Sequence, residues 1–257
     1  MNKAFLIIVI NLLSCIFLDC KKGITDESNL VITSTNMDVG LPTQGLIAYY
    51  PFDGNADDLS GNNNGVNHGA ILTADRFGHN NSAYFFQQIS LIAIPELLSD
   101  TCSQFTFTAW INKNVTDNSI HYVIDKGPAR GSAVLGIKFG YLFFYISVAD
   151  MNGTEYSAEI ADTLRTNVNY FLVGRYIKGQ KVELLINGHI VASITPPNLK
   201  LFSSSIPNYS SSIGYLNSGP TQQYSWIGVI DDIRIYNRAL SDQEVILLYH
   251  EGGWVGN

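Results

Sequence analysis

The stretch that decides the fold is Tyr170–Ile194, which reads YFLVGRYIKGQKVELLINGHIVASI. It holds three runs rich in β-branched and aromatic residues, separated by two short turn signals, a pattern typical of paired strands. The second turn is Asn187-Gly188, a dipeptide that tolerates the positive φ angles of the hairpin turn matching strand twist. The stretch therefore predicts an antiparallel meander of three strands: Tyr170–Ile177, Lys181–Ile186 and His189–Ile194.

Similar short runs recur around this meander, and a helix start signal follows the last of them, Ile227–Tyr236. Ser241 and Glu244 form a capping box, and Val245 and Leu248 then stand at helical spacing, so the helix is expected to pack on a sheet. No composition break occurs after Gly45. Residues 45–257 are therefore predicted to form one all-β domain, a two-sheet antiparallel β-sandwich with one short C-terminal helix. The other expected strands are Leu46–Phe52, Ser82–Phe86, Ile89–Ile94, Phe105–Ile111, Tyr122–Ile124, Val134–Phe139 and Tyr141–Val148.

The composition excludes several classes of protein. The 257 residues include 15 Lys and Arg against 22 Asp and Glu, a formal charge of −7. An acidic chain gains nothing from phosphate backbones, so we expect no nucleic-acid partner. Charged residues make up 14% and apolar residues 46%. The low charge and ordinary apolar share argue against a disordered chain and against a polytopic membrane protein.

The N-terminus reads as a targeting segment. After Lys3, residues 4–18 are almost wholly apolar; the run is too short to span a bilayer, which needs ~20 residues, and has the size of a signal-peptide core. The segment resembles a bacterial lipoprotein signal, which implies a lipid on a cysteine. Cys20, at the end of the run, is the expected lipidation site, and Cys15 is the alternative. An uncleaved anchor or a signal without lipid are further alternatives. Residues 1–20 are thus expected to be the signal and residues 21–44 a flexible tether, since they contain no aromatic side chain.

Several separated motifs of the domain resemble the laminin-G-like, concanavalin A-like jelly-roll domains of bacterial surface proteins. The matching segments are Gly45–Asn55, Asp58–Asn62, Phe105–Trp110, Val182–Val191 and Gly228–Ser241, while Phe85–Ile89 departs from the pattern. The resemblance implies a lipid-anchored binding or adhesion module of the bacterial envelope, at the outer membrane, with a glycan or a surface protein as partner. Carbohydrate is the implied ligand class. A protein-interaction or spacer domain is the alternative, and a glycoside hydrolase is a weaker one.

Catalytic patterns are missing from the sequence. Hydrolases of the laminarinase type carry paired carboxylates on one strand in a Glu-x-Asp-x-x-Glu or Glu-x-Asp-x-Glu pattern, and no such pattern occurs. Glu155 and Glu159 are four residues apart, which separates them by ~13 Å along a strand. The five His show no pair at metal-ligand spacing, and Cys102 has no local base. We therefore expect a binding protein rather than an enzyme.

The aromatic residues do not by themselves reveal a ligand site. Trp110 and Trp226 are expected to pack inside the domain. The tyrosines expected nearer to loops are Tyr122, Tyr141, Tyr215 and Tyr224, and we predict no ligand residue from them.

A structural calcium ion is predicted from one loop and one strand. Asp58, Ser60, Asn62 and Asn64 place oxygen-bearing side chains at every second position of the loop, and Ca²⁺ takes six to eight oxygens. A run of Asx turns without metal would explain the loop equally well. Alternation along Ile227–Tyr236 places Asp231 on the core side, where a carboxylate is costly unless paired or bound to metal. Relatives in the resembled family often carry calcium near this loop, so the predicted ligands are Asp58, Asn62 and Asp231.

Overall fold

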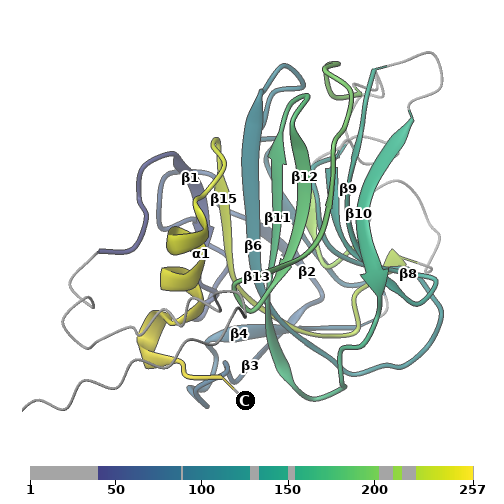
Figure 1. Cartoon of the computed structure of the whole chain (residues 1–257). Helices are drawn as coiled ribbons and strands as arrows, with labels where there is room; N and C mark the ends of the chain where they lie inside the picture. Colours follow the sequence, from purple (N-terminus) through teal and green to yellow (C-terminus); the bar gives the residue numbers. More distant parts are fainter. Residues whose placement is uncertain are drawn as a thin grey trace, which may run out of the picture. The chain divides into compact units, whose positions relative to one another are not determined.

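The chain folds as two antiparallel sheets stacked into a sandwich, which confirms the predicted fold class (Figure 1). The computed structural model describes residues 40–87, 89–127, 133–149, 154–202, 211–215 and 224–256. The first sheet has the strand order β13-β12-β11-β6-β15-β4-β3, with β1 also paired to β15. The second has the order β10-β9-β8-β7-β14-β5-β2.

The strands of the first sheet are β1 (Leu46–Tyr50), β3 (Ile71–Thr73), β4 (Ala83–Phe86), β6 (Gln104–Lys113), β11 (Asn169–Ile177), β12 (Lys181–Ile186), β13 (His189–Ile194) and β15 (Gly228–Tyr236). Those of the second are β2 (Val66–His68), β5 (Leu91–Ile94), β7 (His121–Asp125), β8 (Ala133–Lys138), β9 (Tyr141–Ser147), β10 (Glu155–Ala161) and β14 (Ser211–Ile213). Helix α1 (Asp242–Tyr249) and a 3-10 turn, η3 (Glu251–Gly253), follow the last strand.

The predicted meander is confirmed as β11, β12 and β13, which pair in sequence order. Its hairpin turn has φ 51° at Asn187 and 86° at Gly188, as the Asn-Gly dipeptide requires. Four strands were not predicted: β2, β3 and β14 have three residues each, and β10 reads EYSAEIA with mostly polar side chains. Glu155 and Glu159 lie exposed on this edge strand, β10.

The main core lies between the two sheets and is rich in aromatic side chains. Phe105 packs 5.0 Å from Phe107 and 5.2 Å from Tyr176, measured between ring centroids. Phe144, from the facing sheet, lies edge-on to both phenylalanines. Full burial of one such side chain stabilises the fold by about 1.5–3 kcal/mol, so this cluster is a large part of what holds the sheets together.

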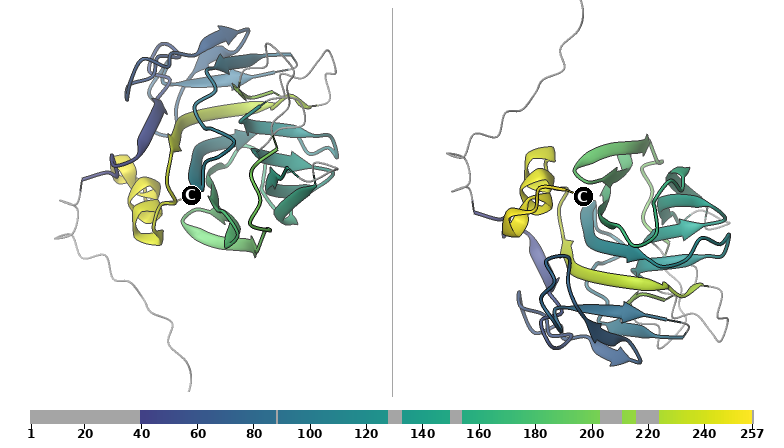
Figure 2. Two further views of the ribbon diagram at one scale, coloured as in Figure 1. Left: turned by 90° about the horizontal axis from the view of Figure 1, so that it is seen from above. Right: turned by 90° about the horizontal axis from the view of Figure 1, so that it is seen from below.

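Helix α1 covers part of the outer face of the first sheet. Ser241 caps it, since the Ser241 hydroxyl accepts from the Glu244 N–H and the Glu244 carboxylate accepts from the Ser241 N–H. Both views of Figure 2 show the helix, in yellow, outside the sandwich and beside β1. Val245 and Leu248 are its buried residues, and they join Trp110 in a second apolar cluster under the helix. Trp110 is thus a packing residue, as predicted.

The compact unit of the sandwich begins at Leu41. The carbonyl of Pro42 accepts a hydrogen bond from Tyr236, and that of Gln44 accepts one from Arg238. The last four residues of the expected tether therefore belong to this unit. The signal segment, both candidate lipidation cysteines and most of the tether lie outside the described residues. In the part of the chain that the structure describes, no helix has the length and apolarity needed to cross a membrane.

Candidate functional site

A hollow of about 230 Å³ opens beside β1 and β15. Four chain segments meet there: β1 with the loop after it, the Asp75–His79 loop between β3 and β4, β15, and η3. We call it the acidic pocket, because five carboxyl groups line it: Asp53, Asp75, Asp231, Asp232 and Glu251. Tyr49 and Phe77 line it as well.

A β-bulge places both aspartates of β15 in the pocket. Asp231 lies opposite Trp110 and Arg234 lies opposite Thr108, so Asp232 and Ile233 face a single residue of β6. Asp232 has φ +46°, an uncommon conformation for a residue that is not glycine. The prediction that Asp231 faces the core is therefore wrong. Cross-strand partners share a face, so Asp231 lies on the outer face with Trp110. After the bulge the alternation is shifted by one residue, and Ile233 and Ile235 face the core.

Arg76 holds the two aspartates together. One of its terminal nitrogens lies 3.2 Å from an oxygen of Asp231 and 2.6 Å from one of Asp232. The hydroxyl of Tyr49 donates to Asp232 at 2.6 Å. The Arg76 guanidinium also lies over the rings of Phe77 and Trp110, 4.5 Å from each centroid. These contacts fix both carboxylates in one orientation.

Burial also changes the charge of the pocket. Desolvation, with the adjacent Asp232 charge, raises the pKa of Asp231 well above its ordinary value despite the opposing effect of Arg76. Burial likewise raises the pKa of Glu251, while Arg234, 2.7 Å away, lowers it in part. Burial therefore opposes the ionisation of Asp231 and Glu251, while the arginine beside each favours it.

Two residues other than glycine with a positive φ angle border the pocket. Asp232 is one, and Phe52, with φ +59°, is the other. Phe52 is fully buried and sits between Pro51 and Asp53, which both line the hollow. Backbone strain of this kind is concentrated at functional sites in proteins. Here it presents Asp53 at the surface.

The predicted calcium ligands do not come together. Asp58 accepts five hydrogen bonds from its surroundings: the N–H of Tyr49, the N–H and hydroxyl of Ser60, and two N–H groups of Asn63. Burial raises the pKa of Asp58, but these donors more than offset it and the net shift is downward. Asn62 is exposed, and Asp231 belongs to the Arg76 cluster.

This arrangement follows the Asx-turn alternative, in which donors of the chain itself satisfy the loop carboxylate. Across the described ranges of the chain, no group of three or more His, Cys, Asp or Glu is placed to hold a metal ion. A cation at this loop would have to replace donors on Asp58, and Asp231 does not lie with the other two predicted ligands. Calcium binding stays a prediction.

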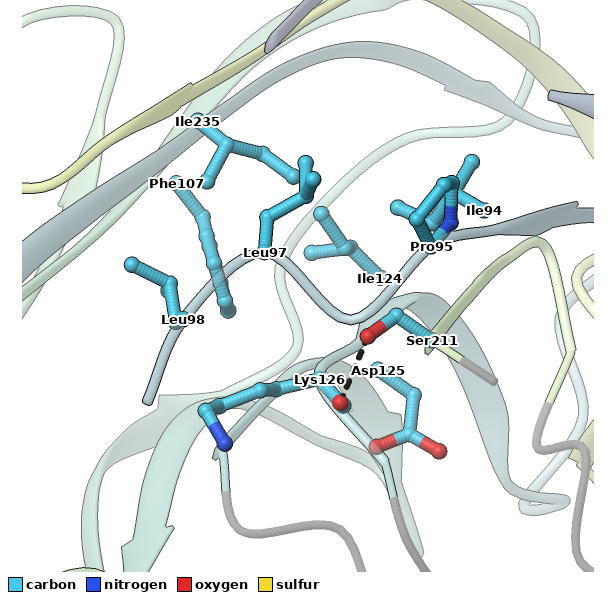
Figure 3. Close-up of a pocket in the computed structure, with 10 residues that line it drawn as sticks. All are labelled: Ile94, Pro95, Leu97, Leu98, Phe107, Ile124, Asp125, Lys126, Ser211 and Ile235. Atoms are coloured by element: carbon cyan, nitrogen blue, oxygen red, sulfur yellow. Dashed lines mark hydrogen bonds between the residues drawn. The ribbon is translucent and has the colours of Figure 1, made fainter. Parts of the chain in front are cut away.

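A second hollow lies between the sheets but is too small for a ligand. Its volume is about 10 Å³, roughly the room needed for one water. Figure 3 shows Leu97, Phe107 and Ile124 gathered over it, with the hydrogen bond from Ser211 to the Lys126 carbonyl at its side. Asp125 also lines it, and burial raises the pKa of this carboxyl to about 7.

The loop tyrosines singled out in the sequence divide into packed and exposed residues. Tyr122 is buried and stacks on Tyr224, with ring centroids 5.6 Å apart, beside Phe143. Tyr215 is buried, whereas Tyr141 is 49% exposed. Trp226 is buried, as predicted. Sequence reasoning missed Phe77 and Arg76; the only local signal was an aromatic and a cation in the turn-rich Ala74–His79 segment.

Comparison with known proteins places this architecture. A sequence model of the Laminin_G_3 family, described as the concanavalin A-like lectin/glucanases superfamily, matches residues 88–246, more than half of the chain. No curated protein matches.

Solved structures share the fold at low identity. Domain 4 of AbnA, an extracellular arabinanase from Geobacillus stearothermophilus, in complex with arabinotriose, is 21% identical with a TM-score of 0.60. The match covers 79% of this chain and 98% of that one. Binding domains of botulinum neurotoxin DC, one in complex with SialylT and one with rat synaptotagmin II, are 16% identical with TM-scores of 0.60, and the match covers 80% of this chain and 51% of theirs. This chain therefore spans about half the length of those toxin chains.

The family match over more than half of the chain, with the jelly-roll sandwich described above, shows that the chain belongs to the concanavalin A-like lectin/glucanase superfamily.

Proposed function

We propose that this chain is a carbohydrate-binding module and that its ligand lies in the acidic pocket. The observation that carries the proposal is the convergence, in one open hollow of about 230 Å³, of carboxylates, an arginine and an exposed aromatic ring. Drug-sized ligands occupy pockets from about 300 Å³ upward, so this hollow suits a single sugar ring.

The polar groups match the hydroxyls of a sugar. A hydroxyl both donates and accepts, while ionised carboxylates only accept and arginine only donates. Asp53 is exposed at the rim, and Asp75 lines the wall. Charge-assisted hydrogen bonds of this kind are stronger than those between neutral groups. They also orient the ring, because the carboxylates come from separate chain segments.

Phe77 provides an aromatic surface against which the C–H groups of a sugar can pack. Its ring is 39% exposed. Trp254 lies edge-on to the ring, with the two centroids 5.8 Å apart, and the Arg76 guanidinium lies over the ring, 4.5 Å from its centroid. A Cβ on Gly252 would stand 2.8 Å from the Phe77 ring, so only glycine allows this approach. The ring is therefore held in place before a ligand arrives.

The structural neighbours support carbohydrate binding in general terms, since one holds arabinotriose and another is in complex with SialylT. The neighbour in complex with synaptotagmin II keeps a protein partner as the second candidate. At such identities the likeness shows the fold alone, so the ligand must be established on this chain.

The test is a glycan array followed by titration calorimetry on the purified protein. Phe77→Ala should raise the Kd of the bound glycan by about tenfold, equal to 1.4 kcal/mol, and Asp53→Ala should weaken binding less. Tyr141→Ala is the matched control, an exposed aromatic residue on the second sheet, and should leave the Kd unchanged. A glycan whose binding survives Phe77→Ala but is lost in Tyr141→Ala would place the site elsewhere. Binding to protein ligands and to no glycan would favour the second candidate.

We also propose that the chain binds glycans without cleaving them. A retaining hydrolase uses two carboxyl groups ~5 Å apart that act directly on the sugar. The carboxylates of Asp231 and Asp232 are close, but the same Arg76 nitrogen binds both, which weakens either as a base or nucleophile. Incubation with the bound polysaccharide should release no reducing ends. Release that is lost in Asp232→Asn would overturn this part of the proposal.

Lipid anchoring at the bacterial envelope is a further part of the proposal, and it rests on the sequence of residues 1–22. Two or more acyl chains hold a protein stably at a membrane, because each buried CH₂ contributes roughly 0.8 kcal/mol. Cys20→Ala should release the protein into the soluble fraction. If the Cys15→Ala protein is released while the Cys20→Ala protein stays at the membrane, Cys15 carries the lipid.

Calcium, with Asp58, Asn62 and Asp231 as its predicted ligands, is proposed on the sequence alone. If the loop binds it, the melting temperature falls in a chelator and elemental analysis finds calcium in the purified protein. Equal melting temperatures and no calcium would leave Asp58 as a carboxylate satisfied by hydrogen bonds.

A further inference from the structure

Lys113, the last residue of β6, is a buried lysine whose ammonium group contacts the carboxylate of Asp162. The two side chains are 7% and 11% exposed. Lys113 belongs to an inner strand of the first sheet, whereas Asp162 directly follows β10, an edge strand of the second. The contact therefore joins the two sheets at one end of the sandwich.

The backbone holds both residues in place. Lys113 is paired with β15, and its carbonyl accepts from the N–H of Asn167 at 2.9 Å. The N–H of Asp162 donates to the carbonyl of Gly140 at 2.8 Å. Within the carboxylate, Oδ1 accepts from the N–H of Leu164 at 2.9 Å, while Oδ2 contacts Nζ of Lys113. The carboxyl group is thus presented to the lysine nitrogen in one orientation.

The surroundings of this contact are largely apolar. Both side chains line a hollow of about 10 Å³, roughly the room for one water. The buried side chains of Ile137 and Trp226 are among its walls. An ion pair is costly in such surroundings, because both charges lose their hydration. A proton that passes from the ammonium to the carboxylate removes both charges and leaves a neutral amine beside a neutral acid.

A second buried lysine shows what distinguishes this contact. Nζ of Lys126 is shared between two carboxylates, Glu96 at 3.2 Å and Asp100 at 2.8 Å. Their side chains are 43% and 25% exposed, so water reaches both. Among the described residues, Lys113 has a single carboxylate partner, and that partner is almost buried.

We propose that Lys113 and Asp162 condense into an amide, an isopeptide bond that links the two sheets. The amine nitrogen attacks the carboxyl carbon of Asp162 and a C–N bond forms, while the N–H of Leu164 stabilises the charge that develops on Oδ1. The nitrogen then loses a proton to the departing hydroxyl, the C–O bond breaks and one water leaves. The condensation needs no oxidant, reductant or further reactant. The bond joins residues 49 positions apart and restricts the unfolded chain, as a disulfide does.

The hollow also offers a route for the protons. It has the room for one water, and His121 and Asp117 line it together with the reacting pair. Nε2 of His121 lies 2.6 Å from the Asp117 carboxylate. Imidazole and carboxylate groups both take up and release protons, so protons can pass between nitrogen and oxygen through a water held there.

Tryptic digestion of the denatured full-length protein, followed by mass spectrometry, tests the inference. Trypsin does not cleave after a lysine whose side chain forms an amide. Residues 77–126 should therefore remain joined to residues 139–165, and the joined peptides should be lighter by one water than their sum. Cleavage after Lys126 is the internal control, because that lysine is buried but shares its charge between two hydrated carboxylates.

Two variants identify the bond. Lys113→Arg keeps the positive charge and removes the amine, so the digest should give residues 77–113 and 139–165 as separate peptides. Asp162→Asn should give the same linked peptide at the same mass as the wild type, because ammonia leaves in place of water and the product amide is identical.

Cleavage after Lys113 in the wild-type protein, with both peptides at full mass, would show a simple ion pair and overturn the inference. A linked peptide that persists in Lys113→Arg would also overturn it, since the bond would then join other residues. Neither result affects the proposed carbohydrate binding, which depends on the acidic pocket.

Discussion

Arg76 is the residue through which the candidate site and the stability of the domain are connected. Its guanidinium pairs with two buried carboxyl groups and lies over two aromatic rings. Removing one partner of a buried ion pair costs about 3–5 kcal/mol, because the remaining charge is left uncompensated.

We predict that Arg76→Met lowers the free energy of unfolding by about 3 kcal/mol at pH 7, measured by urea denaturation. The loss should shrink as the pH falls, because burial raises the pKa of Asp231 and its protonation removes the repulsion between the two carboxyl groups. Arg76→Lys is the control, since it keeps the charge and should recover part of the loss. A loss under about 0.5 kcal/mol, the size typical of a neutral surface substitution, would contradict this account.

Asp125 gives the stability of the domain a pH dependence opposite in sign to the one that an ordinary ion-paired carboxylate gives. It is fully buried, its carboxylate accepts from the Gly127 N–H, and its pKa is raised to about 7 by burial. Between the ordinary carboxyl pKa and about 7, the folded state binds more protons than the unfolded state. The contribution of this group to stability therefore falls as the pH rises through that window.

Asp125→Asn removes the titrating group at constant size. The gain in free energy of unfolding of the variant over the wild type should be larger at pH 8 than at pH 5 by roughly 2–4 kcal/mol. Denaturation curves of both proteins at each pH measure this gain. A difference independent of pH would show that Asp125 titrates normally.

The site residues illustrate what a sequence can and cannot predict. Period-two alternation placed Asp231 on the core side, and it failed because a bulge at Asp232 shifts the period by one residue. A bulge adopted by a residue other than glycine has no local sequence signal. Phe77 and Arg76 become functional candidates only when the fold brings β15 and η3 to their loop.

At the scale of elements, the helix was predictable because its start signal is local. The capping box of Ser241 and Glu244 is present, and Arg238 adds a two-point ion pair to the same carboxylate at 2.6 and 2.8 Å. This ion pair, with the Ser241 donors, lowers the pKa of Glu244 to about 2. The helix thereby keeps Leu248 over Trp110 on the outer face of the first sheet.

Ser241→Ala should lower the free energy of unfolding by about 1 kcal/mol, the usual cost of losing a helix cap. Ser241→Asp, which restores an acceptor at the cap, should recover most of it. Thermal or urea unfolding measures both. An unchanged alanine variant would mean that packing of the helix alone determines where it begins.

The strands divide into those that the local sequence predicts and those that form only by pairing with distant segments. The meander β11–β13 carries alternation and turn residues within one continuous stretch, so sequence alone predicted it. Strands of three residues, such as β2 and β14, form only because β5 lies ready to pair with both of them. Their stability is tertiary in origin, and tertiary pairing leaves no periodicity in so short a segment.

At the scale of the molecule, the sandwich shows membership of a superfamily but does not determine the ligand. One fold hosts many functions, and function depends on sites that individual chains build on it. The neighbours in complex with arabinotriose, SialylT and synaptotagmin II share this architecture at 16–21% identity. On this chain the candidate site is the acidic pocket beside β1 and β15, with Phe77 among its lining residues.

Chemical-shift mapping on isotopically labelled protein tests the central claim most directly. Addition of a glycan selected from the array should shift the backbone amides of Asp75–His79, Asp231–Asp232 and Glu251–Gly252, and leave those of Tyr141–Ser147 in place. Shifts confined to β8, β9 and β10, with the acidic pocket unaffected, would contradict the assignment of the site.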